Sequence, residues 1–162
     1  MGTKDIGAAE SSERVLVVER TFDAPRSLVF KAWIEPEHLF NWYGPRGFTI
    51  GSFTLDPRPG GPWRCCMVSP ERREHWVRGV FREVAEPERL AFTWAHENED
   101  GTPGHETLIT VTFAEQGKQT RLTLRQEIFE SIEARNDHRT GWASSLECLA
   151  EYLAGIELDQ QN

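Results

Sequence analysis

The sequence contains no long apolar run. No stretch of about 18 consecutive apolar residues occurs along the chain, so we expect no transmembrane helix and no membrane insertion. Residues 1–13 also lack the apolar region that a secretory signal peptide requires. These two absences predict a protein of the cytoplasm.

Cysteine is scarce as well. Cys65, Cys66 and Cys148 make an odd number, which in a chain without a signal peptide favours reduced thiols. Cys65 and Cys66 are adjacent, so on a strand their side chains point to opposite faces and a disulfide between them would be strained. The five histidines show no ligand spacing with the cysteines, and we therefore predict no metal site.

Basic residues are outnumbered by acidic ones. The chain has 18 Lys and Arg against 26 Asp and Glu, a formal net charge of −8, so we expect no nucleic-acid partner. The chain also shows no nucleophile elbow, phosphate-binding loop or metalloprotease motif. We therefore assign no catalytic residue and no cofactor, and the sequence leaves the oligomeric state open.

Aromatic residues, by contrast, are abundant. Six tryptophans and nine phenylalanines, with a hydrophobic content of 38%, are enough to build a core. A chain of 162 residues fits one domain. We place that domain at residues 14–155, with a disordered N-terminal tail at 1–13 and a C-terminal tail at 156–162.

Periodicity predicts the order of the elements. A β-branched strand at 14–22 precedes two short helices, the first opened by Pro25 and the second by Pro36. Period-two alternation then predicts six strands, at 48–56, 62–69, 75–87, 89–96, 106–115 and 119–129. A long helix follows, with Asp137 as candidate N-cap and Gly155 as the stop. This order predicts the α+β class, with an antiparallel sheet packed on helices.

A stiff connection leads into one aromatic strand. The prolines and glycines of 56–62 form a sharp turn, after which alternation sets Trp63, Cys65 and Met67 on one face. Large, adaptable side chains of this kind suit the wall of an apolar pocket. The alternative is plain core packing against the last helix, and the sequence leaves both open.

Two further strands and the last helix offer similar faces. Phe92, Trp94 and His96 share one strand face, and Leu124 and Gln126 share another. If these faces look inward, Trp94, His96 and Gln126 supply a ring and polar groups to a ligand. The alternative is a solvent-exposed strand end, which we favour for His96.

The helices supply the remaining candidates. Trp142 and Leu146 lie on the apolar stripe of the final helix, where Trp142 either caps a cavity or packs as part of the stripe. Trp42 and Tyr43, beside Gly44, are candidates for the cavity mouth, whereas Trp33 is expected to pack under the sheet edge.

Five segments together resemble a known family. They are 23–45, 56–68, 78–94, 110–124 and 141–153, and they are similar to the START-like (SRPBCC) helix-grip superfamily and, within it, to the family named for the activator of the heat-shock protein 90 ATPase. The resemblance implies a curved antiparallel sheet of about six to seven strands wrapped on a long C-terminal helix. It also implies a cavity between them.

The expected function follows from that cavity. The resemblance implies binding of a small hydrophobic ligand, such as a lipid, a sterol or an aromatic polyketide-like molecule. One alternative is a protein-interaction module that activates a heat-shock protein 90 chaperone, and another is an enzyme of the polyketide cyclase or dehydratase type. The candidate cavity residues are Trp63, Cys65, Met67, Phe92, Trp94, Leu124, Gln126, Trp142 and Leu146, with Trp42 and Tyr43 at the mouth.

Overall fold

The described part of the chain, residues 14–161 of a computed structural model, follows the predicted order of elements. The segment 1–13, expected to be disordered, lies outside the described residues. The elements are β1 (Leu16–Phe22), α2 (Arg26–Lys31), α3 (Pro36–Trp42), β2 (Thr49–Leu55), β3 (Pro62–Val68), β4 (Glu74–Ala85), β5 (Arg89–His96), β6 (Thr107–Gln116), β7 (Gln119–Glu127) and α4 (Ile132–Gln161).

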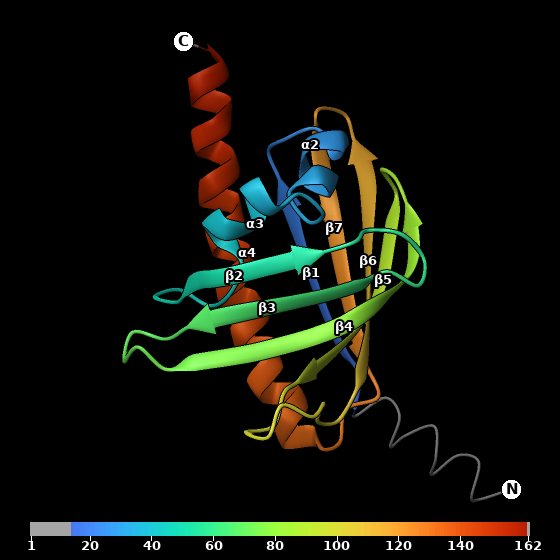
Figure 1. Cartoon of the computed structure of the whole chain (residues 1–162). Helices are drawn as coiled ribbons and strands as arrows, with labels where there is room; N and C mark the ends of the chain where they lie inside the picture. Colours follow the sequence, from blue (N-terminus) through green and yellow to red (C-terminus); the bar gives the residue numbers. More distant parts are fainter. Residues whose placement is uncertain (1–13, 162) are drawn as a thin grey trace, which may run out of the picture.

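The strands form one curved antiparallel sheet that grips α4, as expected. Its strand order is β1-β7-β6-β5-β4-β3-β2. β1 therefore forms one edge beside β7, the last strand in the sequence, while β2 forms the opposite edge and β3 to β7 follow in order from it. Figure 1 shows β2, β3 and β4 running crosswise to β1, β6 and β7, with α4 along the inside of the curve. This arrangement is the helix-grip fold.

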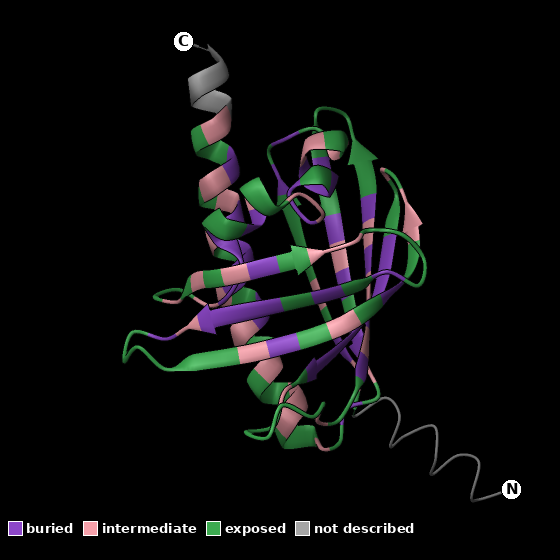
Figure 2. Cartoon of the chain, viewed as in Figure 1, coloured by how far each residue is buried: buried purple, intermediate pink, exposed green. Residues whose placement is uncertain are grey.

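The helix does not approach the whole sheet equally. It packs most closely on β1 and α3, while β3 to β5 curve away from it. Buried residues alternate with less buried ones along β6 and β7, which places one face of these strands on the helix (Figure 2). Leu146, Leu149 and Leu153 fill most of the interior from the helix side. Space is therefore left near the beginning of α4 rather than along its length.

The sheet bends where the β4–β5 ladder opens. Arg78 pairs with Ala95, and Phe81 pairs with Phe92, but the two intervening pairs are absent among the described strand residues. Side chains take the place of the ladder there: Trp63 Nε1 donates to the Thr93 carbonyl at 3.0 Å, and Thr93 Oγ1 accepts from the Val80 amide at 2.8 Å. These two hydrogen bonds pair the Thr93 carbonyl and the Val80 amide at the opening.

The final helix differs from the sequence prediction at both ends. It begins at Ile132, five residues before the proposed N-cap Asp137, because the Ser131 hydroxyl accepts a hydrogen bond from the Ala134 amide at 3.0 Å and caps it. It also continues through Gly155 to Gln161. One face of this part of α4, which includes His138, Gly141, Trp142 and Ser145, lies toward the sheet.

The stiff connection before β3 forms a tight turn, as expected. Gly60 has φ +85, and Arg58 Nε donates to Asp56 Oδ2 at 2.7 Å, which fixes the turn from the side. The turn is paired to β4 through the Phe81 amide and the Gly61 carbonyl at 2.8 Å. None of the described helices combines the length and the apolar character that spanning a membrane needs.

Candidate functional site

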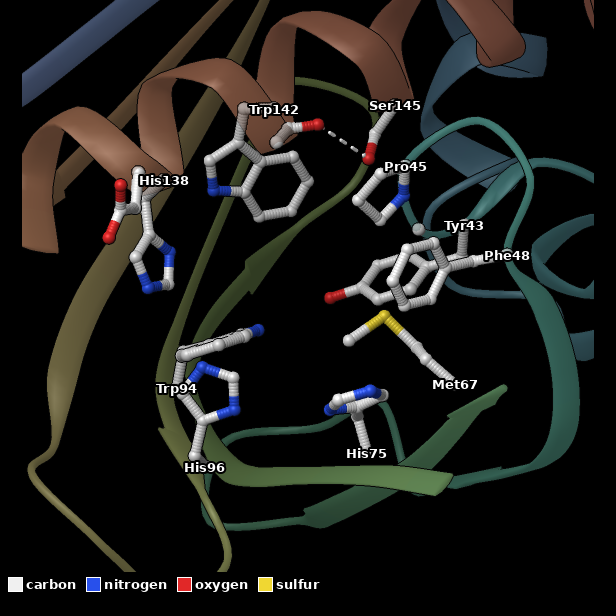
Figure 3. A pocket seen from close by; sticks show the side chains of 13 residues that line it. Tyr43, Pro45, Phe48, Met67, His75, Trp94, His96, His138, Trp142 and Ser145 are labelled. Carbon is white, nitrogen blue, oxygen red and sulfur yellow. Dashed lines mark hydrogen bonds between the residues drawn. The ribbon is translucent and has the colours of Figure 1, made fainter. Parts of the chain in front are cut away.

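A cavity of about 240 Å³ opens between the first half of α4 and the sheet. It lies where β3, β4 and β5 turn away from the helix, beside the loop between α3 and β2 (Figure 3). Its lining residues are Tyr43, Gly44, Pro45, Phe48, Met67, His75, Trp94, His96, Asp137, His138, Gly141, Trp142 and Ser145.

Three aromatic side chains form the deepest walls. Trp94 comes from β5, Trp142 from α4 and Tyr43 from the end of α3, and all three are buried. The rings of Tyr43 and Trp142 meet edge to face, with centroids 6.0 Å apart. Met67 completes the floor with its thioether, which Figure 3 shows pointing into the space. The interior is therefore mainly apolar.

Gly44 lets the loop pass close over the floor. Its φ of +96 is in the left-handed region, and an added Cβ would lie 3.3 Å from the Met67 sulfur. Glycine therefore allows α3 to end at Trp42 and the chain to reverse at once into Pro45 and the loop. The loop in turn covers one side of the cavity with Phe48.

A chain of buried hydrogen bonds orients the Trp142 side chain and links it to the backbone of Trp94. Trp142 Nε1 donates to Gln126 Oε1 at 2.9 Å, and Gln126 Nε2 donates to Thr107 Oγ1 at 2.9 Å. Thr107 Oγ1 then donates to the Trp94 carbonyl at 2.9 Å. All four residues are buried, so the orientation of Trp142 is set by β7 and β6 rather than by solvent.

Three histidines surround the outer part of the cavity. His96 and His138 lie against Trp94, with ring centroids 4.6 and 4.7 Å from the indole, and His75 lies across the opening (Figure 3). Burial, and to a smaller extent the neighbouring His96, lowers the pKa of His138 to about 4. Loss of hydration where the His96 ring packs against Trp94, and to a smaller extent the neighbouring His75, lowers the pKa of His96. Both imidazoles are therefore neutral at pH 7 and act as hydrogen-bonding groups without charge.

The lowered pKa of His138 predicts a pH dependence of stability. The unfolded chain protonates histidine near the ordinary pKa of about 6.5. The folded chain protonates His138 only near 4, so the unfolded state binds more protons between these values. This contribution to stability is complete above pH 6.5 and is lost as the pH falls toward 4. On going from pH 7.5 to pH 5, we expect the free energy of unfolding to decrease less for His138→Gln than for the natural protein. Urea unfolding at the two pH values measures both decreases.

A control separates this effect from general acid unfolding. His105 is exposed and lies outside the cavity, so His105→Gln is expected to keep the full decrease of the natural protein. An equal loss of stability for His138→Gln and the natural protein would contradict the assignment.

The structure brings four of the sequence candidates together. Tyr43, Met67, Trp94 and Trp142 all line the cavity. His96, for which an exposed strand end was favoured, is exposed as a whole residue, but its ring packs against Trp94 and His138 and lines the outer part of the cavity.

The remaining candidates lie outside this lining. Trp63 and Phe92 face a separate inner void of about 10 Å³, which Tyr43 also borders. The other five are buried in the surrounding core, and they are Trp42, Cys65, Leu124, Gln126 and Leu146. Gln126 nevertheless reaches the site indirectly, through the Trp142 indole that it orients.

Sequence reasoning missed His75, His138, Gly141 and Ser145. His138, Gly141 and Ser145 are spaced three and four residues from one another and lie around the candidate Trp142, so helical periodicity could have identified them on the same face of α4. His75 gave no local signal, because its position depends on the pairing of Met67 with His75 across β3 and β4.

The adjacent cysteines are unreactive in this environment. Cys65 and Cys66 are buried free thiols on opposite faces of β3. Burial raises the pKa of Cys65 to about 12, with a further contribution from Cys66. Burial also raises the pKa of Cys66. Because the thiolate is the nucleophile, neither residue is available for covalent chemistry at neutral pH.

A group of possible metal ligands lies away from the cavity. Ligand atoms of Glu35, Glu37 and His38 lie within 4.8 Å of one another on and beside α3. His38 already contacts the Tyr152 hydroxyl at 2.6 Å and Glu35 at 3.4 Å. His38 therefore links α3 to Tyr152 of α4, which gives this group of residues a structural role.

Comparisons with known proteins agree with this architecture. The model of the family described as Activator of Hsp90 ATPase homolog 1-like protein matches residues 23–154. The crystal structure of the AHSA1 protein from Silicibacter pomeroyi has 30% sequence identity and a TM-score of 0.81, covering 86% of this chain and 97% of its own. A crystal structure from Nitrosomonas europaea has 25% identity and a TM-score of 0.77, covering 91% and 98%. None of the curated proteins matches the chain.

Proposed function

The chain belongs to the family of Activator of Hsp90 ATPase homolog 1-like proteins, and from this premise we propose that it binds a small, mainly apolar organic molecule between its sheet and α4. The observation that carries the proposal is the aromatic cavity beside residues 43–48, with Trp94 as one wall and Trp142, oriented by Gln126, as another. Folds of this type commonly bind hydrophobic ligands in the same place.

The size of the cavity narrows the expected ligand. Pockets for drug-sized ligands are typically about 300–1,000 Å³, and a volume of about 240 Å³ falls below that range. Leu146, Leu149 and Leu153 fill the space further along the helix, which leaves no room for a long acyl chain in the described interior. We therefore favour a compact one- or two-ring molecule over a lipid or a whole sterol.

A cavity-filling substitution tests the proposal. A Cβ at Gly141 would lie 3.9 Å from Pro45, an ordinary contact distance, so Gly141→Leu fits the helix and fills the cavity. We expect at least a tenfold loss of affinity for 2-acetylnaphthalene, measured by tryptophan fluorescence and isothermal titration calorimetry. Stability should stay the same or rise by up to ~1 kcal/mol, because glycine inside a helix is unfavourable.

The matched control is Gly155→Leu. Gly155 lies on the same helix with no atom within 4 Å of an added Cβ, and it is outside the cavity lining. This variant should bind 2-acetylnaphthalene as the natural protein does. If Gly141→Leu bound 2-acetylnaphthalene as tightly as the natural protein does, the probe would bind outside this cavity. That result would contradict the proposal.

A second candidate function is catalysis on a carbonyl compound. It is favoured by the imidazoles of His96 and His138, which lie beside Trp94 and are in their neutral, unprotonated form at pH 7. Exchange of the α-protons of 2-acetylnaphthalene in D₂O, with and without protein, would separate catalysis from simple binding.

Activation of a chaperone ATPase has weaker support. An exposed apolar patch on the outer face of the sheet would favour it. Among the described residues, the large exposed apolar side chains lie on β1, on α3, on β4 and around the β7–α4 connection, and they are Val17, Phe40, Val80, Ile128 and Ile132. They are distributed over separate elements, so they do not mark one docking surface. A cytoplasmic location remains part of the proposal and rests on the three free cysteines.

A further inference from the structure

Three imidazoles stand at the rim of the cavity, on the two sides of the seam between the sheet and α4. His96, at the end of β5, pairs with Val77, two residues beyond His75 on β4, so both imidazoles lie on the same face of the sheet. His138 projects from α4 on the side of Trp94 and His96 (Figure 3). Because β5 curves away from the helix here, these side chains bridge the seam.

The two sides of the seam meet on the indole of Trp94. His96 packs edge to face on this ring with centroids 4.6 Å apart, and His138 does so from α4 at 4.7 Å. The centroids of the two imidazoles are 6.0 Å apart. Within residues 14–161, neither imidazole makes a hydrogen bond or an ion pair. The seam is therefore closed by contacts between uncharged rings.

This packing does not accommodate charge on both rings. A single imidazolium against an indole gains a cation–π contact. Two of them, as close together as His96 and His138 are and largely removed from water, repel each other and lose their hydration. Protonation of the pair therefore favours a state in which the rings separate and water enters the seam.

The size of this preference follows from His138. In the closed seam the pKa of this residue is about 4, whereas an imidazole in water has a pKa of about 6.5. Between these values the open state binds more protons than the closed state. For His138 alone, opening becomes about 30-fold more favourable at pH 5 than at pH 7.5.

A polar hollow of about 370 Å³ lies directly outside the rim and shares His75 and His96 with the cavity. The other charged residues that line it are Arg64, Glu74, Glu97 and Glu99. Arg64 is already paired with Glu97 at 2.6 Å, which leaves Glu74 and Glu99 to face an imidazolium. The hollow therefore offers hydrated, negatively charged surroundings to a protonated ring that leaves the rim.

The remaining charged groups near the seam do not reverse this preference. Asp137 lies beside His138 on α4, and Glu130 faces His96 from the segment before α4. Each carboxylate raises the pKa of its neighbouring imidazole, but by less than burial and the adjacent imidazole lower it. The cavity lining contains no Lys or Arg.

We propose that His96 and His138 form an acid-operated gate, in which uncharged rings close the seam between β5 and α4 at neutral pH and protonated rings open it in mild acid. Opening speeds the exchange of the bound molecule. This inference rests on the proposed ligand-binding function and adds its regulation. His75 belongs to the same gate, since it borders both the cavity and the outer hollow.

The rate at which a neutral probe leaves the protein measures the gate. 2-Acetylnaphthalene has no group that titrates between pH 5 and pH 7.5, so an effect of pH on its release belongs to the protein. Stopped-flow tryptophan fluorescence should show release about tenfold or more faster at pH 5 than at pH 7.5. In His138→Gln this ratio should fall to about threefold or less, because glutamine does not gain the charge. Comparing ratios cancels any change in release at neutral pH that the lost ring contact causes.

His105→Gln is the matched control. His105 is exposed and borders neither the cavity nor the hollow, so this variant should keep the full ratio of the natural protein. Equal release rates at the two pH values in the natural protein would overturn the gate and leave ligand binding in place. A full ratio in His138→Gln would overturn it as well.

Acrylamide quenching tests the gate without any ligand. This neutral quencher should reach the buried Trp94 and Trp142 more readily at pH 5 than at pH 7.5 in the natural protein, but not in His138→Gln. Far-ultraviolet circular dichroism at pH 5 should show intact helix and sheet, and its loss would mean general acid unfolding and overturn the gate. Failure of 2-acetylnaphthalene to bind at pH 7.5 would contradict the proposed function. Quenching would then still decide the gate, since no rise at pH 5 would overturn it.

Discussion

Gly79→Ala is expected to destabilise the domain by about 3 kcal/mol or more. A Cβ at Gly79 would lie 1.8 Å from the Thr93 carbonyl oxygen and 2.5 Å from Trp63 Nε1. Both neighbours are fixed, one as backbone and the other as a buried indole that donates to that same carbonyl at 3.0 Å. β4 must therefore move away from β5, and the hydrogen bond from Trp63 Nε1 to the Thr93 carbonyl is lost.

Urea unfolding followed by circular dichroism would measure this loss. Gly155→Ala is the matched control, because an added Cβ meets no atom within 4 Å on a helix surface. It should stabilise the domain by up to ~1 kcal/mol, since alanine favours the helix over glycine. If Gly79→Ala were as stable as the natural protein, the close approach of β4 to β5 at this point would be wrong.

Gln126→Leu is expected to cost about 2–3 kcal/mol of stability and to weaken ligand binding as well. Leucine is similar in size but offers no acceptor to the Trp142 indole and no donor to Thr107. Gln126 is fully buried, so water does not replace either partner easily. The Trp142 ring then loses the bond that orients it, and one wall of the cavity becomes mobile.

Two measurements distinguish these consequences. Thermal or urea unfolding reports the stability, and near-ultraviolet circular dichroism reports the environment of Trp142. Gln119→Leu, at the exposed start of the same strand, is the control for the chemical change and should leave both signals unaltered. A Gln126→Leu protein with natural stability and an unchanged aromatic signal would show that the buried hydrogen-bond chain does not hold the wall.

Local patterns were sufficient for most of the fold. The alternation in β6 and β7 and the prolines at positions 25 and 36 predicted the strands and the two short helices, because these features act within a few residues. The boundaries of α4 were predicted wrongly, since Ser131 caps the helix ahead of Asp137 and the single glycine at position 155 does not end it.

The site was predictable only in part. Alternation correctly placed Trp94 and Met67 on inward faces, but it placed Cys65, Leu124 and Leu146 there equally. Nothing local distinguishes an inward residue that packs in the core from one that lines a cavity. His75 reaches the cavity through strand register, and Gln126 affects it through a hydrogen bond to a residue on another element.

The amino-acid sequence by itself determined the order of strands and helices and the apolar faces, because each depends on side chains a few positions apart. The helix-grip architecture was an expectation from the resemblance of five segments to a known family. Tertiary structure alone decided where the interior stays open. The β4–β5 opening at Gly79 turns the outer strands away from α4, and the cavity remains at the one end where helix and sheet separate. Curvature of that kind is a property of the whole sheet, and it brings Tyr43, Trp94 and His138 together from three distant segments.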